Sequence, residues 1–439
     1  MKYQIFQMKN NFFNNSVSFK NKNYLFLVYF FYSLLILILS AFFVIAFINK
    51  FGMIDENYNL IVKDIFYAHG PLIDRIISNN DYFTFVDHVK FFLQKTLAIP
   101  IIISTLAKIN SNIFFVILVK NLLFFSIYFL VCLFFAIEKK INFFNFLILI
   151  LIPIFIPYNL LVSFNFVYED CLVALLLPCL YLCLLMKEDY KYYLISALVF
   201  FLYFVKTSMF LIVLVTPLII ILLEGNNKKK FLPLLFSIFA ILIWGYYGIH
   251  KTGKFPFGSA GSSYNTHVMS FSFNKDFHKF YPNKSTDLIP TKKTPSSIND
   301  EWAYFDYYKN ENTKYLNENK IRFFKDSIIK LKFIFFSIRR DGAFPDKNGN
   351  YDNRLRFSLV INKIFFNISI LVLFFNFIRM YKFKKFTENQ HNLYFFSLLC
   401  LNLPPHLIAW ATSKHLIGIT SISIIYLFFN FIIKKEKIL

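Results

Sequence analysis

The chain has 439 residues, of which 57% are hydrophobic and 16% are charged, and its formal net charge is +22 at pH 7. This composition, arranged in repeated long apolar runs, excludes an ordinary soluble globular protein and predicts an integral membrane protein. The basic residues lie between the apolar runs, where they anchor membrane spans, so the positive charge does not indicate a nucleic-acid partner.

The first apolar run, residues 24–48, carries no charged side chain and is long enough to cross a bilayer as a helix. Residues 1–23 before it contain lysines and no acid. This pattern predicts an uncleaved signal anchor with a cytoplasmic N-terminal segment. We therefore expect a multi-pass protein of a bacterial inner (plasma) membrane, which has membrane lipids as its surroundings.

An acid pair, Asp55 and Glu56, directly follows the first span, and Tyr58 lies close behind it. Acids are scarce in this chain, with 25 Asp and Glu against 47 Lys and Arg. An ionisable pair beside a membrane span is therefore a candidate functional site. The alternative is that Asp55 only caps a short helix at the membrane interface.

The first outer loop, residues 50–110, is expected to carry helices that lie at the interface. Residues 97–107 are apolar but too short to span the bilayer, and we expect Pro100 to interrupt them. A second span at about 111–137 follows and ends in a basic turn that is typical of the cytoplasmic side.

A second acid pair, Glu169 and Asp170, lies between two apolar runs, 141–157 and 171–186, whose other flanks are basic. The rule that basic loops stay in the cytoplasm puts this pair outside, on the same membrane face as Asp55. The agreement in sidedness supports a site on the outer face.

Lys206 interrupts the long apolar run 193–223, which has basic residues at both ends. Two short spans or a deep hairpin would put Lys206 near the outer surface, whereas a single tilted helix would let it snorkel. A span at 231–249 leads into the longest polar region, 250–340, which is predicted to be a periplasmic loop domain. Its last part, 318–338, has apolar residues at helical spacing among lysines, a pattern typical of a helix on a bilayer.

Three final spans fit the C-terminal region, and the outer turn between the last two carries Lys414 and His415. Counting the runs gives about ten crossings with both termini inside. The expected fold class is all-α, a polytopic transmembrane helix bundle with interfacial helices and one large periplasmic loop region. The expected parts are the N-terminal segment 1–23, the transmembrane regions 24–249 and 341–439, and the loop domain 250–340.

The charged residues expected on the outer face suit group transfer from a lipid-phosphate donor. A carboxylate can act as a general base on a hydroxyl or bind a divalent metal. Lysines can neutralise a phosphate that becomes a leaving group. No cofactor is identified with certainty, and a divalent metal fits only if the two acid pairs converge.

With these residues in place, the chain resembles the polytopic GT-C-type glycosyltransferases that use lipid-phosphate sugars, such as protein O-mannosyltransferases and aminoarabinose transferases. The resemblance covers roughly residues 24–250 in order and position. Lys206 stands where an arginine is usual, and His415 stands where a tyrosine is usual. The matching residues are Asp55, Glu56 and Tyr58 after the first span, Leu97-Ala98-Ile99-Pro100 and Val116 to Asn121, Glu169 after the third span, Lys206, and Lys414-His415.

The resemblance implies a glycosyltransferase that moves a sugar from a polyprenyl-phosphate donor to a hydroxyl on a lipid, glycan or protein at the periplasmic face. It implies that the first acid of the loop activates or positions the acceptor hydroxyl and that basic residues hold the donor phosphate. The expected roles are catalysis for Asp55 and Glu56, acceptor or metal support for Tyr58, Glu169 and Asp170, and donor-phosphate binding for Lys206, Lys414 and His415.

Two alternatives stay open at this point. A flippase or transporter of lipid-linked glycans would place charges inside its spans, as Lys120, Lys206 and Lys363 would do. A polymerase of lipid-linked glycans would instead rely on arginines of the large outer loop, which are Arg322, Arg339 and Arg340.

Overall fold

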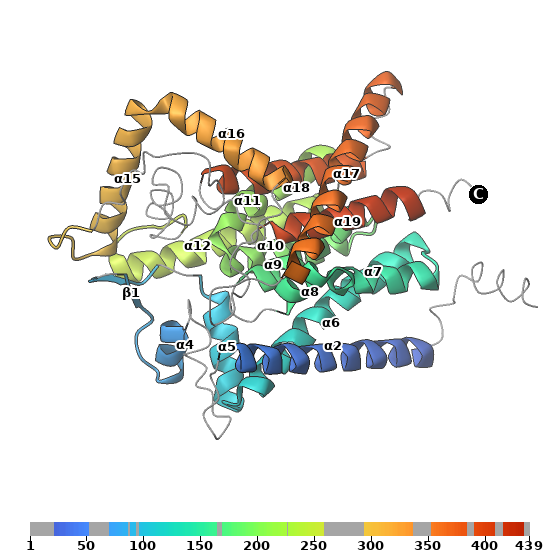
Figure 1. The fold of residues 1–439 in the computed structure, drawn as a ribbon, viewed down its shortest axis with the longest axis horizontal. Helices are drawn as coiled ribbons and strands as arrows, with labels where there is room; N and C mark the ends of the chain where they lie inside the picture. The colour runs from blue at the N-terminus through green and yellow to red at the C-terminus, as the bar shows by residue number, and fades with distance from the viewer. Residues whose placement is uncertain are drawn as a thin grey trace, which may run out of the picture.

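The computed structural model describes residues 22–51, 70–86, 88–93, 96–164, 169–225, 227–258, 294–336, 353–383, 390–408 and 416–433. Within these ranges the chain is mostly helical, with one small two-stranded hairpin (Figure 1). The elements in chain order are α2 (Lys22–Phe51), α4 (Gly70–Ile77), β1 (Thr84–Val86), β2 (Val89–Phe91), α5 (Ala98–Ile109), α6 (Ile113–Lys139), α7 (Phe143–Phe155), α8 (Pro157–Ser163), α9 (Asp170–Leu185), α10 (Lys191–Val205), α11 (Phe210–Leu223), α12 (Leu232–Thr252), α15 (Glu301–Glu318), α16 (Lys320–Phe336), α17 (Asn353–Phe383), α18 (Gln390–Ile408) and α19 (Ile417–Phe428).

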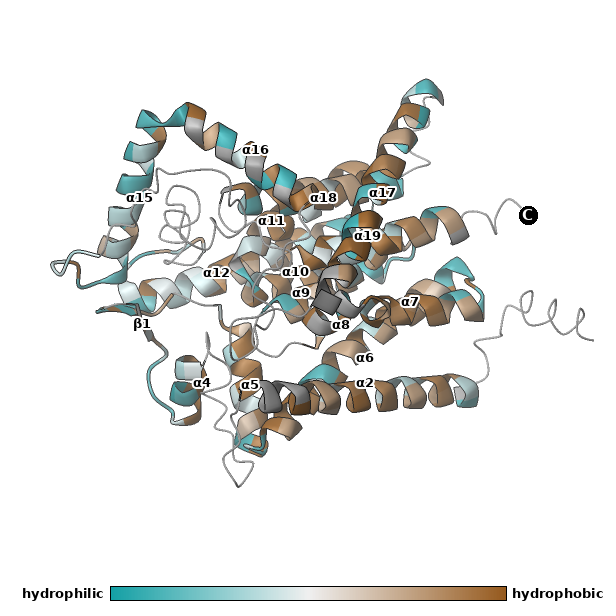
Figure 2. Ribbon diagram, in the orientation of Figure 1, coloured by the Kyte–Doolittle hydropathy of each residue, from teal (hydrophilic) through white to brown (hydrophobic). Residues whose placement is uncertain are grey.

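Among the described residues, four helices are long and apolar enough to cross a membrane. They are Asn23–Ile45, Ile113–Lys139, Lys228–Thr252 and Leu359–Lys382. Shorter apolar helices pack beside them, and the hydrophobic colouring of Figure 2 covers most of the bundle. The architecture agrees with the all-α class and is compatible with the membrane protein that the composition predicts.

Helix α9 forms the centre of the bundle. Every residue from Asp170 to Leu185 is buried, and the helix packs against α6, α8, α10, α18 and α19. A helix that is apolar on all sides buries its whole surface only when other helices surround it. The charged residue at its start is therefore held in a fixed position by the whole bundle.

The close packing of α19 on α9 gives a first testable prediction. A Cβ atom at Gly418 would lie 2.9 Å from side-chain atoms of both Val173 and Leu177. Gly418→Ala is therefore expected to lower the free energy of unfolding by about 1–2 kcal/mol through overpacking. Gly225→Ala is the matched control, because nothing lies within 4 Å of a Cβ atom there. Thermal unfolding in detergent measures both, and equal losses would contradict this account of the contact.

The run around Lys206 folds as two short helices, one of the two arrangements that its sequence predicts. Helix α10 ends at Val205, a short 3-10 turn occupies Thr207–Met209, and α11 begins at Phe210. The expectation that Pro100 interrupts a helix is wrong, because Pro100 is the third residue of α5. Proline lacks a backbone N–H, but the N–H groups of the first helical turn have no intrahelical acceptor, so proline there removes no hydrogen bond.

The polar region before α17 contributes two described helices, α15 and α16, and rests on a hairpin that the sequence did not predict. Strands β1 and β2 pair antiparallel, with Thr84 opposite Phe91. Helix α15 packs against β2, and its Tyr304 ring meets the ring of Phe91 at a centroid distance of 4.9 Å. In Figure 1, α15 and the hairpin lie together at one end of the bundle, and α16 leads back from there.

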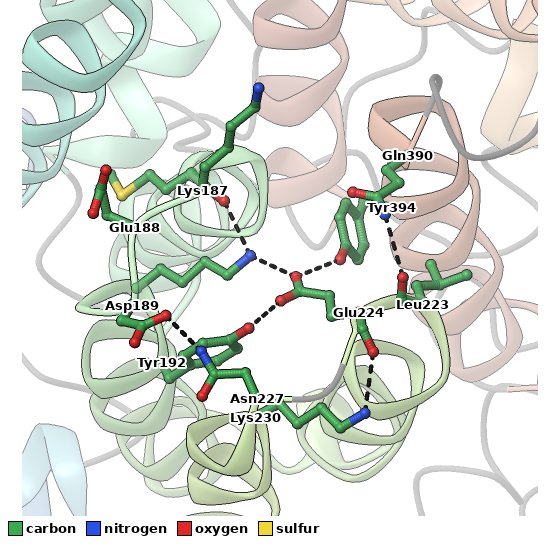
Figure 3. A network of polar contacts seen from close by, with 12 residues as sticks. Lys187, Glu188, Asp189, Tyr192, Leu223, Glu224, Asn227, Lys230, Gln390 and Tyr394 are labelled. Atoms are coloured by element: carbon green, nitrogen blue, oxygen red, sulfur yellow. Dashed lines mark hydrogen bonds and ion pairs between the residues drawn. The ribbon is translucent and has the colours of Figure 1, made fainter.

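At the opposite end of α9 and α10, a buried carboxylate joins three helices (Figure 3). Glu224, directly after α11, accepts hydrogen bonds from Lys191 Nζ at 2.6 Å, Tyr192 Oη at 2.5 Å and Tyr394 Oη at 2.8 Å. The side chains of Lys191 and Glu224 are only 7% and 8% exposed. These bonds connect α10, α11 and α18 through one charged group.

A second carboxylate at this end joins the end of α6 to the turn between α9 and α10. Glu138 accepts hydrogen bonds from the backbone N–H groups of Lys187 at 2.5 Å and Glu188 at 3.3 Å. The hydroxyl of Tyr190 donates to the same carboxylate at 3.2 Å. The acids at this end therefore serve the connections between helices.

Candidate functional site

Two of the predicted site residues meet at the end of the bundle where α9 begins. Helices α9 and α10 are consecutive, packed together and joined by a short turn, so the start of α9 lies beside the end of α10. Lys206 Nζ lies 2.5 Å from Asp170 Oδ1. The Lys206 side chain is 13% exposed and that of Asp170 is 2% exposed. The structure thus forms an almost fully desolvated ion pair from residues 36 positions apart in the sequence.

Local structure explains why each charge lies where it does. Asp170 is in the first turn of α9, where a negative charge interacts favourably with the helix dipole. Lys206 follows the last residue of α10 and has an extended backbone, with φ −154° and ψ 124°. Its N–H still donates to the carbonyl of Leu202, which completes the last turn of α10. The helix break thereby places the ammonium group beside α9.

Residues of the loop between α4 and α5 contact the end of α10 that precedes Lys206. Thr96 donates from Oγ1 to the carbonyl of Val205, the residue before Lys206, at 3.0 Å. The Tyr82 hydroxyl donates to the Thr96 carbonyl at 3.4 Å, and Tyr247 donates to the carbonyl of Tyr82 at 3.4 Å. This chain of contacts connects the loop, the end of α10 and the end of α12.

Tyr82 also lies within electrostatic reach of Glu169. Burial raises the pKa of the Tyr82 hydroxyl well above its usual value, and nearby Tyr247 and Glu169 raise the pKa further. The hydroxyl therefore stays protonated and remains a hydrogen-bond donor at neutral pH. Glu169 itself is partly exposed at the start of α9, whereas Asp170 is buried.

A second lysine lies close to this end of α9 from the side of α6. Lys120 is 1% exposed, and its Nζ lies 3.7 Å from Sγ of Cys171, the residue after Asp170. The next residue, Asn121, donates to Oγ of Ser40 in α2 at 3.0 Å. A buried lysine within an apolar span is costly and marks a functional position by default.

Glu301, the first residue of α15, lies beside the segment that leads from the hairpin to α5. Its side chain is 3% exposed, and its Oε2 accepts a hydrogen bond from the backbone N–H of Leu93 at 3.1 Å. Its Oε1 is buried and makes no hydrogen bond within the described residues. Burial raises the pKa of this carboxyl to about 7, although the backbone hydrogen bonds oppose the rise.

This raised pKa predicts how the attachment of α15 depends on pH. Because the folded state holds the Glu301 proton up to about pH 7 while an unfolded carboxyl loses it near pH 4.5, stability falls as pH rises through this interval. Backbone amide hydrogen exchange in α15 is expected to accelerate from pH 5 to pH 8 by more than the pH dependence of intrinsic exchange accounts for. Glu301→Gln should abolish this extra dependence. Asp306→Asn, at an exposed position of α15, is the control.

The remaining predicted site residues lie outside the part of the chain that the structure describes. These are Asp55, Glu56, Tyr58, Lys414 and His415. Their roles stay predictions. Within the described ranges, no three His, Cys, Asp or Glu side chains lie close enough together to bind a metal ion. The expectation of a divalent metal needs the first acid pair and stays untested.

The structure joins two residues whose predicted roles are separate: acceptor or metal support for Asp170 and donor-phosphate binding for Lys206. It also adds neighbours that the sequence did not single out as site residues, namely Tyr82, Thr96, Tyr247 and Cys171. Tyrosine is common here, with 27 residues, so no single one stood out. Glu301 carried a usable signal as a scarce acid among aromatic residues.

Comparisons with known proteins add no identification. No family model, curated protein or solved structure matches this chain.

Proposed function

We propose that this protein is a membrane glycosyltransferase of GT-C type that moves a sugar from a polyprenyl-phosphate donor to a hydroxyl acceptor. The observation that carries the proposal is the ion pair of Asp170 and Lys206 at the end of the bundle that the hairpin and α15 adjoin. A desolvated acid and lysine at this position suit an anionic headgroup that lies at membrane depth.

In this proposal Lys206 holds the donor phosphate. Asp170 fixes the ammonium group in place and balances its charge while the site is empty of substrate. The ammonium group would face the phosphate oxygen on which negative charge develops as the bond to the sugar breaks. A charge positioned in advance in a dry site lowers the barrier more than a solvated one does.

The sugar transfer itself would use the acid pair of the first loop. The acceptor oxygen attacks the anomeric carbon, the bond from that carbon to the phosphate oxygen breaks, and polyprenyl phosphate leaves. Asp55 would accept the proton of the acceptor hydroxyl, with Glu56 as its partner. If α5 lies at the interface and α7, α9, α10, α11, α18 and α19 cross the membrane beside the four long helices, the chain makes ten crossings. With a cytoplasmic N-terminus, three crossings precede Asp170, and the proposed site would face the periplasm.

A transfer assay tests the proposal. Purified wild-type protein, Asp55→Asn and the exposed-acid control Asp74→Asn would each receive a mixed pool of polyprenyl-phosphate sugars and membrane extract as acceptor. We expect transfer by wild type and Asp74→Asn, and a loss of at least about 100-fold in Asp55→Asn. Equal transfer by all three would remove Asp55 from the chemistry.

One observation favours a second function, a flippase of lipid-linked glycans. Lys120 is buried within α6, and Lys363 is buried within α17, where its Nζ donates to the carbonyl of Ile334. Charged residues inside spans are typical of a transport path. If wild type transfers no sugar but moves a lipid-linked glycan across liposomes, this second function replaces the first.

A further inference from the structure

Helix α16 exposes an apolar face that no described part of the protein covers. Ile321 and Phe324 are 75% and 66% exposed, and Ile328 is 40% exposed. Their spacing of three and four residues places them on one side of the helix. Lys325 and Lys332 are also exposed and follow Ile321 by four and eleven residues, which puts them on the same side.

The opposite side of α16 is attached to the bundle. Lys330 and Ile334 are 1% and 0% exposed, and the helix packs against α17 and α18 near its C-terminal end. Asn367 of α17 donates from Nδ2 to the carbonyl of Phe335 at 3.0 Å. The helix therefore has a fixed rotation about its axis, which turns the apolar and basic side outward.

Helix α15 is a useful contrast within the same outer region. Its exposed positions include Lys309, Asn310 and Lys314, and Figure 2 shows it as mostly hydrophilic while α16 alternates. The two helices are consecutive, yet only α16 combines exposed Ile and Phe with exposed lysines. The exposed polar side chains of α15 are favourably hydrated, whereas the exposed apolar side chains of α16 favour contact with an apolar partner.

We propose that the exposed side of α16 lies on the membrane and contacts anionic phospholipid headgroups of the outer leaflet. The apolar residues enter the boundary of the acyl chains, and Lys325 and Lys332 extend their stems toward the headgroup phosphates. Helix α17, against which α16 packs, also exposes apolar side chains, with Phe357 70% and Ile364 50% exposed. Helix α16 thus anchors the outer region, with α15 and the hairpin, to the lipid surface.

Depth-dependent fluorescence quenching tests this contact in the full-length protein. Cysteine replaces Phe324 or Ile328 in a Cys400→Ser background, because the other described cysteines are buried. Asn310→Cys on α15 is the matched control. Each variant is labelled with an environment-sensitive dye and placed in vesicles of phosphatidylethanolamine and phosphatidylglycerol, about three to one, that carry a headgroup-level quencher.

We expect the labels at positions 324 and 328 to be quenched about twofold or more, and the label at position 310 to remain unquenched. Lys325→Glu with Lys332→Glu should reduce the quenching, and so should replacement of phosphatidylglycerol by a zwitterionic lipid. Equal quenching at positions 324 and 310 overturns the proposal. Quenching that is the same in anionic and in zwitterionic vesicles also overturns it. Self-quenching between labelled copies would instead assign the surface to a second chain. The readout is independent of catalytic activity, so it stands apart from the proposed glycosyl transfer.

Discussion

Lys206→Met is expected to destabilise the protein by about 3–5 kcal/mol, because it removes the ammonium group that faces the buried Asp170 carboxylate. A paired change, Asp170→Leu with Lys206→Met, should recover much of this loss, since it removes both charges from the apolar surroundings. Chemical unfolding in detergent of the two single variants and the double variant measures the coupling between the residues.

The matched control for this pair is Lys229→Met. Lys229 and Asp189 also form an ion pair, with Nζ and Oδ2 3.1 Å apart, but their side chains are 45% and 50% exposed. Solvent and salt screen such a pair, so little change is expected. If Lys206→Met costs no more than this control, the pair contributes little to the position of α10 beside α9.

A conservative variant of Lys206 separates the residue's effect on stability from its effect on activity under the proposed function. Lys206→Arg retains the positive charge and should keep the fold, although the wider guanidinium group changes the geometry at the phosphate. Transfer by this variant is expected to fall mainly through a higher KM for the donor. Unchanged KM in a well-folded Lys206→Arg would separate Lys206 from donor binding.

Glu224→Ala is expected to be the second most damaging change, with a loss of about 3–5 kcal/mol. It removes the acceptor of three hydrogen bonds and leaves the Lys191 ammonium without its carboxylate in a buried setting. Thermal unfolding in detergent provides the measurement. Glu188→Ala serves as the control because that side chain is exposed in the neighbouring turn.

The partner residues provide a second check on this network. Tyr394→Phe removes one neutral donor and should cost only about 1 kcal/mol. Glu224→Leu combined with Lys191→Met should be milder than Glu224→Ala alone, since no unpaired charge remains. Should Glu224→Ala match Glu188→Ala in stability, the connection of α10, α11 and α18 does not depend on this carboxylate.

The sequence was sufficient for the features that depend on local composition. Long apolar runs predicted a helical membrane bundle, and the uninterrupted apolar character of 171–186 agrees with the central position of α9. Lys206 predicted a break in its run, because a charge in the middle of an apolar helix is costly. The positive-inside rule predicts that Glu169, Asp170 and Lys206 share one membrane face, and in the structure Asp170 and Lys206 form an ion pair.

Only the tertiary structure decided which charges face one another and which are buried. Asp170 binds Lys206 because α9 and α10 pack antiparallel with these two side chains facing each other, and the sequence patterns do not pair the two residues. Glu301 acquires its raised pKa only because α15 packs on the hairpin region, a contact between residues 208 positions apart, such as Leu93 and Glu301. A sequence determines hydrophobic periodicity residue by residue, whereas desolvation and partner choice arise only when separate helices come together.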